Sequence, residues 1–155
     1  MGFATLSLKG RALKLLSLRE HSRLELERKL AAHVQEGDDL AAVLDELERR
    51  GFISAQRVAE SVLHGKASRL GSGRLLQELR SKGLDETIVR EAAEQLRGTE
   101  LQRAHALWLK RFGAPPATPQ EHMRQMRFLA GRGFGAEVAS KVIKGRVGDS
   151  EGDLE

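Results

Sequence analysis

The organisation of the chain is clearest in the segment Arg69–Leu84, which reads RLGSGRLLQELRSKGL. Leu75, Leu76 and Leu79 are spaced so that they share one face of a helix, which leaves the basic side chains to the other faces. Gly83 suits the left-handed conformation that ends many helices, and the apolar residue that follows can fold back onto the helix. The segment therefore predicts a short amphipathic helix that ends at a glycine.

The same pattern returns towards the C-terminus. The letters LRSKGL at residues 79–84 correspond to LAGRGF at residues 129–134, and apolar positions coincide beyond them, as Ile88 does with Val138. Alanines occupy equivalent positions near the start of three successive rounds of helices; they are Ala12, Ala59 and Ala104. A unit that recurs in this way cannot bury its apolar face alone and is expected to stack against its neighbours.

The composition favours helix throughout. The chain of 155 residues is 40% hydrophobic but only 4% aromatic, and it is rich in strong helix formers. Capping signals and glycines divide it into about nine short helices. We therefore predict an all-α fold, in which three tandem three-helix repeats form an elongated, curved helical array. The predicted units are residues 1–52, 53–98 and 99–145, followed by a disordered acidic tail at residues 146–155.

Several classes of protein are disfavoured by the sequence. The absence of cysteine excludes disulfides and thiolate metal sites, and is typical of an intracellular protein. The N-terminal residues do not resemble a signal peptide, and no run of about 18 apolar residues could span a membrane. We therefore expect a cytoplasmic monomer that does not associate with membranes.

Patterns that would indicate catalysis or a cofactor are also missing. Residues 71–74 lack the ending of a phosphate-binding loop, and residues 131–136 match GxGxxA by letter without a preceding strand. The histidines have no metal-ligand spacing and are expected at surface or boundary positions; they are His21, His33, His64, His105 and His122. The sequence therefore predicts a binding protein that is not an enzyme and that uses no cofactor or metal.

The net charge of +4 is unevenly distributed along the chain. Residues 1–50 are neutral in balance, and residues 51–98 carry +2. Residues 99–145 contain eight basic and three acidic residues, a balance of +5, while residues 146–155 carry −3. This gradient indicates an anionic partner on the side of the third unit. The alternative is that the charge only keeps a helical surface soluble.

The candidate partner-binding and DNA-binding residues are the basic side chains of the second and third units. Arginine in particular suits phosphates and carboxylates, because its planar guanidinium donates paired hydrogen bonds. The alternative for these residues is a solvated helix face without a ligand. The candidates are Lys66, Arg69, Arg74, Arg80, Lys82, Arg124, Arg127 and Arg132.

Four groups of residues, taken in order, resemble the bacterial RecX family. They are EHSRxxLxxxL at residues 20–30, LxxRGFI at residues 47–53, GRxxxELRxxG at residues 73–83, and FLxxRGF at residues 128–134. The resemblance extends over about residues 8–145. It departs from the family in two places: residues 54–59 lack the usual acidic residue and have Val58 where phenylalanine is common, and the linker contains Pro115–Pro116.

The resemblance implies both a fold and a function. RecX proteins consist of three tandem three-helix repeats and bind the RecA nucleoprotein filament. They suppress its ATPase, strand-exchange and co-protease activities, and so act as negative regulators of homologous recombination and the SOS response. The expected partner is therefore a RecA filament on DNA. The alternative is a helical repeat protein that binds single- or double-stranded DNA directly, without regard to sequence.

Overall fold

The computed structural model of the chain describes residues 5–145, and within that range it contains helices and loops but no strand. The helices are α1 (Leu8–Leu18), α2 (Arg23–Leu30), η1 (Ala31–His33), α3 (Leu40–Arg49), α4 (Ala55–Lys66), α5 (Ser72–Ser81), α6 (Glu86–Arg97), α7 (Glu100–Arg111), α8 (Pro119–Gly131) and α9 (Ala136–Ile143). The predicted all-α fold is confirmed. The predicted tail, residues 146–155, lies outside the described residues, and the predicted unit boundaries stay a prediction.

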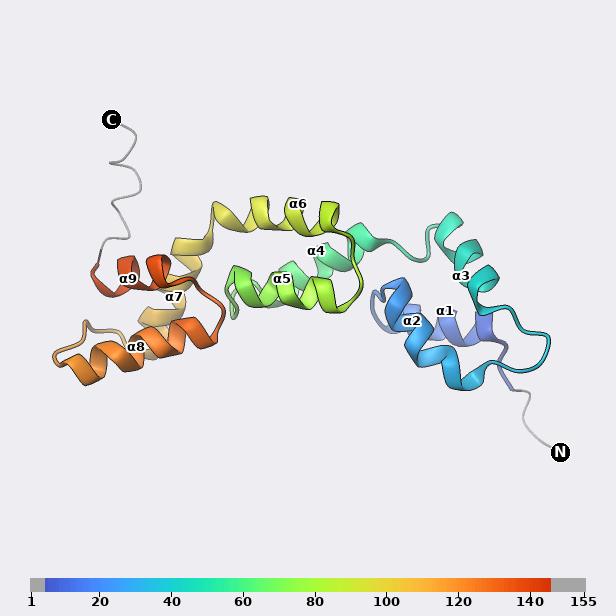
Figure 1. Cartoon of the computed structure of the whole chain (residues 1–155), viewed down its shortest axis with the longest axis horizontal. Helices are drawn as coiled ribbons and strands as arrows, with labels where there is room; N and C mark the ends of the chain where they lie inside the picture. The colour runs from blue at the N-terminus through green and yellow to red at the C-terminus, as the bar shows by residue number, and fades with distance from the viewer. Residues whose placement is uncertain (1–4, 146–155) are drawn as a thin grey trace.

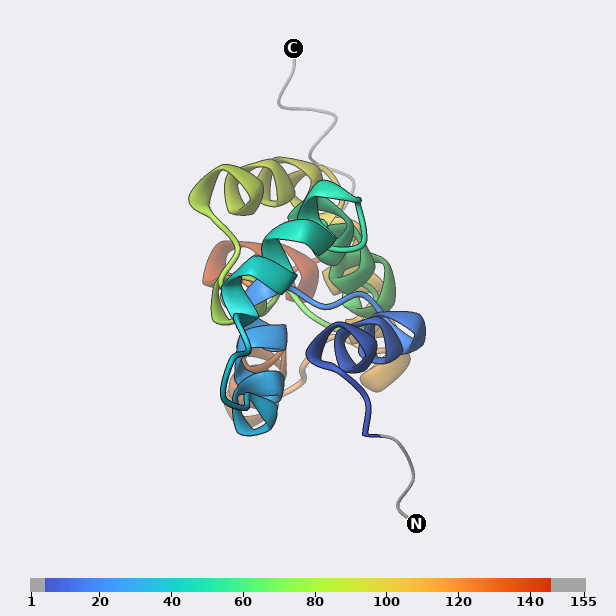
Figure 2. The same cartoon turned by 90° about the vertical axis from the view of Figure 1, so that its right-hand side faces the viewer.

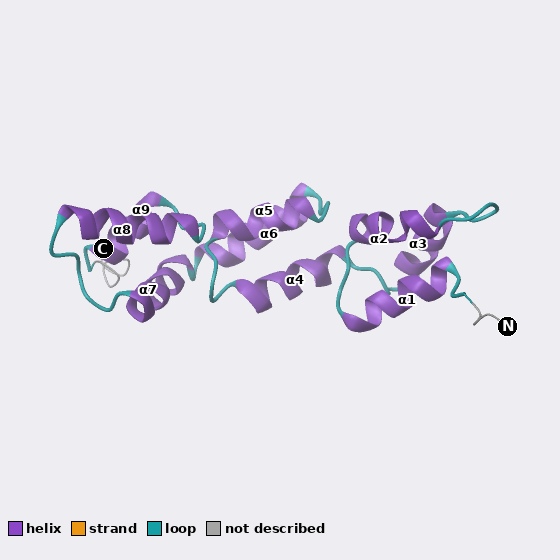
Figure 3. Cartoon of the chain, turned by 90° about the horizontal axis from the view of Figure 1, so that it is seen from below, coloured by secondary structure: helices purple, strands orange, loops and turns teal. Residues whose placement is uncertain are grey.

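The helices form three groups that follow one another along the long axis of the molecule (Figures 1 and 3). We call α1–α3 repeat one, α4–α6 repeat two and α7–α9 repeat three. The view along the long axis shows the groups behind one another (Figure 2). Each repeat has an apolar cluster of its own, so the array has three small cores in series rather than one large core.

Equivalent positions of the repeats are buried in the same way. The middle helix of each repeat has a leucine at an equivalent core position; Leu30, Leu79 and Leu129 are all no more than 1% exposed. The first helix of each repeat meets the core through an alanine, which lets the helices approach closely. These alanines are Ala12, Ala59 and Ala104, all of them buried.

One core position of repeat three is polar. Gln125 is only 5% exposed and lies where repeat two has Leu75. Its Oε1 accepts a hydrogen bond of 2.8 Å from Nε1 of Trp108, and its amide donates to the carbonyl of Ala114 at 3.1 Å. A buried tryptophan N–H needs such an acceptor. Gln125 therefore satisfies the indole and also ties the proline-containing linker to the core.

Repeats two and three meet through their backbones. The amide of Gly71 donates to the carbonyl of Arg132 at 2.7 Å, and the amide of Gly73 donates to the carbonyl of Gly133 at 3.0 Å. A Cβ atom on Gly71 would lie 2.4 Å from the carbonyl carbon of Gly133. Only a residue without a side chain allows the start of α5 to approach the end of α8 this closely.

Side chains at the same junction reinforce this contact. Arg103, whose side chain is 13% exposed, donates to the carbonyls of Ala67 and Leu70 at 2.9 and 2.8 Å. Glu100 forms an ion pair with Arg103 and accepts hydrogen bonds from the amide and hydroxyl of Ser72. The first backbone amides of α5 are therefore satisfied by groups that belong to repeat three.

We predict that Gly71→Ala destabilises the protein through this junction. Gly71 has φ of −81° and ψ of 168°, which alanine adopts without strain, so the cost comes from the clash with Gly133 alone. Overpacking of this kind costs about 1–3 kcal/mol. Thermal unfolding followed by circular dichroism should show a lower melting temperature.

Gly65→Ala is the matched control for this substitution. Gly65 lies inside α4, and a Cβ atom there would meet nothing within 4 Å. Replacing a helical glycine by alanine should stabilise the protein by about 0.5–1 kcal/mol. Equal melting temperatures for the two variants would contradict the close approach of Gly71 to Gly133.

Candidate functional site

Seven of the eight basic residues selected from the sequence fall into two groups in the structure, and the eighth, Arg69, lines a cleft. Members of the first group are held in ion pairs with carboxylates. The pairs are Lys66 with Glu78 at 2.5 Å, Arg80 with Glu86 at 3.0 Å, and Lys82 with Glu25 at 3.2 Å. The carboxylate partner already offsets the positive charge of each of these side chains, so they attract a further anion less strongly than an arginine without such a partner.

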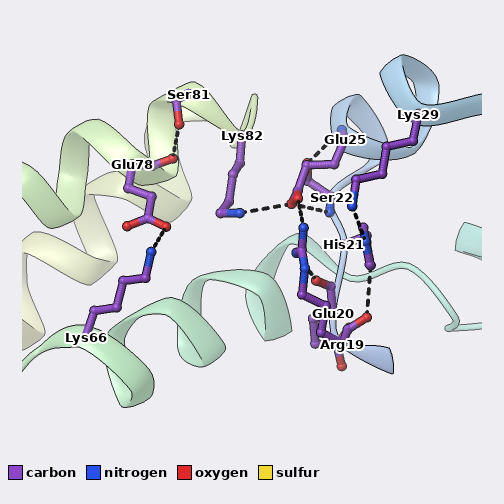
Figure 4. A network of polar contacts seen from close by, with 10 residues as sticks. All are labelled: Arg19, Glu20, His21, Ser22, Glu25, Lys29, Lys66, Glu78, Ser81 and Lys82. Carbon is purple, nitrogen blue, oxygen red and sulfur yellow. Dashed lines mark hydrogen bonds and ion pairs between the residues drawn. The ribbon is translucent and has the colours of Figure 1, made fainter. Parts of the chain in front are cut away.

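The pair formed by Lys82 belongs to a network between repeats one and two (Figure 4). The carboxylate of Glu25 accepts hydrogen bonds from Lys82 at 3.2 Å, from the amide of Ser22 at 3.1 Å and from Arg19 at 2.6 Å. Burial alone would raise the pKa of Glu25, but the hydrogen bonds from Arg19, Ser22 and Lys82 outweigh it and lower the pKa to about 2. Glu25 therefore stays ionised at neutral pH.

His21 lies beside this network and is only 1% exposed, so the expected surface or boundary position is wrong for this histidine. Its Nδ1 lies 3.0 Å from the carbonyl of Arg19, and its Nε2 lies 3.0 Å from Nζ of Lys29. Because the ammonium of Lys29 can only donate, Nε2 accepts and Nδ1 carries the hydrogen. Burial lowers the pKa of His21, although the hydrogen bond to Arg19 opposes this effect.

A cleft of about 380 Å³ adjoins the network between repeats one and two. Arg69 lines it together with Lys66 and Lys82, and the guanidinium of Arg69 donates to the carbonyl of Gly65 at 3.3 Å. Three of the candidate basic residues, all from repeat two, therefore line this cleft, and no candidate from repeat three does. Carboxylates of Glu20 and Glu78 also line it.

The second group of candidates forms no ion pair among the described residues. On α8, Arg124 and Arg127 are one turn apart and exposed, on the face opposite the buried Gln125 and Leu129. Arg74 of repeat two reaches across the junction and donates to the carbonyl of Gly131 at 3.1 Å. This contact brings the Arg74 side chain to the C-terminal end of α8.

Arg132 and a second arginine, Arg111, both lie against one aromatic ring. The guanidinium carbons of Arg132 and Arg111 lie 5.3 and 5.8 Å from the centre of the Phe128 ring. Arg111 also lies 5.7 Å from the ring of Phe112, which packs edge-on against Phe128. Cation–π contacts orient a guanidinium without occupying its N–H donors. The two arginines are therefore oriented and still able to bind an anion.

Sequence reasoning missed Arg111. The spacing of Phe128 and Arg132 along α8 could have indicated their contact, because residues four apart share a helix face. The approach of Arg111 to Phe128 depends on how the end of α7 packs against α8, which the sequence does not state. We call the resulting set the arginine surface; it consists of Arg74, Arg111, Arg124, Arg127 and Arg132.

In residues 5–145, no group of three or more His, Cys, Asp or Glu side chains is arranged to hold a metal ion. None of the helices that the structure describes combines the length and apolarity needed to cross a membrane. The fold and the arginine surface together define a helical-repeat protein with a basic surface at one end.

Comparison with known proteins then gives the family. Models of the second and third three-helix domains of RecX match residues 56–92 and 99–143. The regulatory protein RecX of Leptothrix cholodnii is 51% identical over 148 residues, which cover 96% of this chain and 93% of that protein. RecX of Ralstonia nicotianae is 49% identical over 140 residues, 90% of this chain and 88% of that protein. The chain belongs to the RecX family of regulatory proteins.

Solved structures agree on the fold. A crystal structure of regulatory protein RecX superposes with a TM-score of 0.75 at 22% identity and covers 88% of this chain and 71% of that chain. RecX from Lactobacillus salivarius gives a TM-score of 0.73 at 20% identity and covers 90% of this chain and 94% of that chain. The resemblance found in the sequence and the predicted repeat fold are therefore both confirmed.

We predict that His21 makes the stability of the protein sensitive to acid. Its pKa in the folded protein is below the ordinary value of 6.5, so the unfolded chain takes up a proton more readily. The free energy of unfolding should therefore fall as pH drops below 6.5, by at most about 1.4 kcal/mol per pH unit from this group. Glu25, whose pKa is about 2, contributes to the loss only below its ordinary value of 4.5.

Urea unfolding at a series of pH values from 7 to 5 measures this effect. His21→Gln should flatten the dependence on pH, whatever its effect on stability at pH 7. His64→Gln, which removes an exposed imidazole, controls for the substitution itself. An unchanged slope in His21→Gln would show that His21 takes up its proton in the folded state as readily as in the unfolded chain.

Proposed function

We propose that the protein is a negative regulator of homologous recombination that binds the filament formed by RecA on DNA. Three observations support this proposal: membership of the RecX family, whose members are named regulatory proteins; the elongated array of repeats; and the arginine surface. The observation that carries most weight is the arginine surface, because guanidinium groups that form no ion pair among the described residues keep their N–H donors available for phosphates or carboxylates of a partner.

The choice of proposed binding residues rests on which basic side chains form ion pairs within the described part of the chain and which do not. Lys66, Arg80 and Lys82 already contact carboxylates of this chain and stabilise its fold. The arginine surface offers several planar donors over α8, the end of α7 and the start of α5, and such donors fit phosphates and carboxylates in paired geometry. We therefore propose that repeat three, with Arg74 of repeat two, makes the primary contact with the filament.

Binding along the filament would also explain how the protein inhibits the activities of the filament. An elongated array that lies along a filament covers surface that the filament needs for strand exchange and for contact with other proteins. Inhibition of the filament ATPase, strand exchange and co-protease activities, and so of the SOS response, is the proposed outcome. The protein performs no reaction of its own in this proposal, and it acts as a monomer in the cytoplasm.

Direct binding of DNA is the second candidate function. The same arginines support it, because guanidinium groups on exposed helix faces bind phosphates of any base sequence. In this case the filament protein would be dispensable, and bare single- or double-stranded DNA would be the ligand.

We predict that Arg124→Glu with Arg127→Glu weakens inhibition of the filament ATPase at least about tenfold, since each lost charged contact costs on the order of 1 kcal/mol or more. Both side chains are exposed on α8 and form no ion pair in the described part of the chain, so the fold should survive. If Arg124 and Arg127 both contact phosphates, the variant should also depend less on salt: the negative slope of log affinity against log salt should become shallower by about 1.4–1.8. ATPase assays at several salt concentrations measure both effects.

Arg28→Glu with Arg49→Glu is the matched control. These exposed residues of repeat one also form no ion pair among the described residues, and the change in net charge is the same. This variant should inhibit like the wild type. If the α8 variant is folded by circular dichroism and also inhibits like the wild type, the site assignment is wrong.

Separate baits distinguish the two candidate functions. Pre-formed filaments, free recombinase and bare single-stranded DNA are immobilised separately, and retention of the wild-type protein is measured on each. Preference for filaments supports the first candidate. Equal retention on bare DNA supports the second.

A further inference from the structure

The two junctions of the array differ in kind. Repeats two and three share backbone–backbone hydrogen bonds, from Gly71 to Arg132 and from Gly73 to Gly133. No backbone–backbone hydrogen bond in the described residues joins repeat one to repeat two. The apolar clusters of repeats one and two are also separate. Apart from the covalent linker, repeat one is therefore held to repeat two by side chains.

Those side chains are few and mostly charged. Lys82 of repeat two pairs with Glu25 of repeat one at 3.2 Å, and Arg57 pairs with Glu20 at 2.9 Å. The Lys82–Glu25 pair is largely buried, at 17% and 14% side-chain exposure. The other two side chains, Arg57 and Glu20, are 44% and 31% exposed. An ion pair that is this open to solvent contributes little to stability. Arg57 also donates an exposed hydrogen bond of 2.6 Å to the carbonyl of Gly51, so Lys82–Glu25 is the one of these polar contacts that is largely buried.

The contact around Glu25 is narrow. The side chain of Leu24 lies against Gly83, where an added Cβ would come within 2.8 Å of it. Clefts of about 380 and 440 Å³ flank this contact, and residues of both repeats line each of them. A small contact between two clefts is the geometry of a pivot, because the neighbouring surfaces can approach or separate without a clash.

Capping explains why the two junctions differ. Helix α5 has no capping side chain, so its first amides bond to repeat three. Helix α2 has its own capping box, in which Ser22 and Glu25 satisfy its first amides. The start of α2 therefore has no need of acceptors from repeat two. It meets the end of α5 through Lys82, whose charge is stabilising near a helix C-terminus.

We infer that the array bends at the junction of repeats one and two, and that Glu25, which is itself held by Arg19 of repeat one, keeps this junction closed through its ion pair with Lys82. Repeats two and three move as one body. Repeat one swings about the contact between Leu24 and Gly83 when this ion pair opens. This inference concerns the shape of the free protein and does not depend on the proposed function.

Glu25→Gln tests this ion pair without removing the cap. Glutamine can replace glutamate in a capping box, so α2 keeps its N-terminal hydrogen bonds while the charge on Lys82 and Arg19 loses its partner. Glu78→Gln is the matched control. It removes a carboxylate of equal charge from the pair with Lys66, which lies wholly within repeat two.

Pulsed electron paramagnetic resonance between spin labels measures the shape directly. The chain has no cysteine, so cysteines introduced at the exposed positions Lys14, Glu91 and Ala106 are the only labelling sites. The pair at residues 14 and 91 spans the junction of repeats one and two. The pair at residues 91 and 106 spans the junction of repeats two and three.

In Glu25→Gln, the distance distribution between residues 14 and 91 should lose its single narrow maximum and broaden. The distribution between residues 91 and 106 should stay narrow, and Glu78→Gln should match the parent protein for both pairs. Raising salt from about 0.1 to 1 M shortens the screening length from about 10 to 3 Å, but a largely buried pair is screened less than an exposed one, so salt should broaden the first distribution less than Glu25→Gln does.

Three results would overturn the inference. The first is a narrow distribution between residues 14 and 91 in Glu25→Gln. The second is equal broadening in Glu78→Gln, which would attribute the effect to lost charge in general. The third is equal broadening of both distances, which would show that the array has no single joint. Circular dichroism of each variant confirms that its helices are intact.

Discussion

The start of helix α5 is the point on which the architecture depends. A helix leaves its first amides without partners inside the helix, and a buried amide without an acceptor is costly. In α5 these acceptors are the carbonyls of Arg132 and Gly133 and the carboxylate of Glu100, all from repeat three. The middle helices α8 and α5 are thus stacked end to end, and neither repeat can be moved without exposing polar backbone of the other.

The same end-to-end arrangement continues to α2, but with a different chemistry. Because α2 caps itself, its contact with the end of α5 uses a carboxylate and an ammonium instead of backbone groups. The middle helices of the three repeats therefore lie in a row. Backbone hydrogen bonds join α8 to α5, whereas an ion pair between side chains joins α5 to α2. The joint between repeats one and two lies at the end of the array away from the arginine surface, so movement of repeat one leaves the arrangement of those arginines unchanged.

Much of the fold could be predicted from the sequence, because helix periodicity and caps are local. The glycine stop at Gly83 is confirmed by its φ of 78°, and the leucine spacing places Leu75 and Leu79 in the core. The site was less predictable. Lys82 has the sequence neighbours of a surface cation, yet its partner Glu25 lies 57 residues away. Whether a basic residue is free to bind a ligand depends on such distant partners, which no local pattern reveals.

The hydrogen bond between Trp108 and Gln125 gives the molecule a reporter of its own. The chain contains one tryptophan, and this indole lies in the core of repeat three, stacked at 5.8 Å on the ring of His105. Its fluorescence therefore senses the environment of one repeat, while far-UV circular dichroism averages over all the helices. A difference between the two signals during unfolding would reveal whether the three cores melt together or one after another, with no label added to the chain.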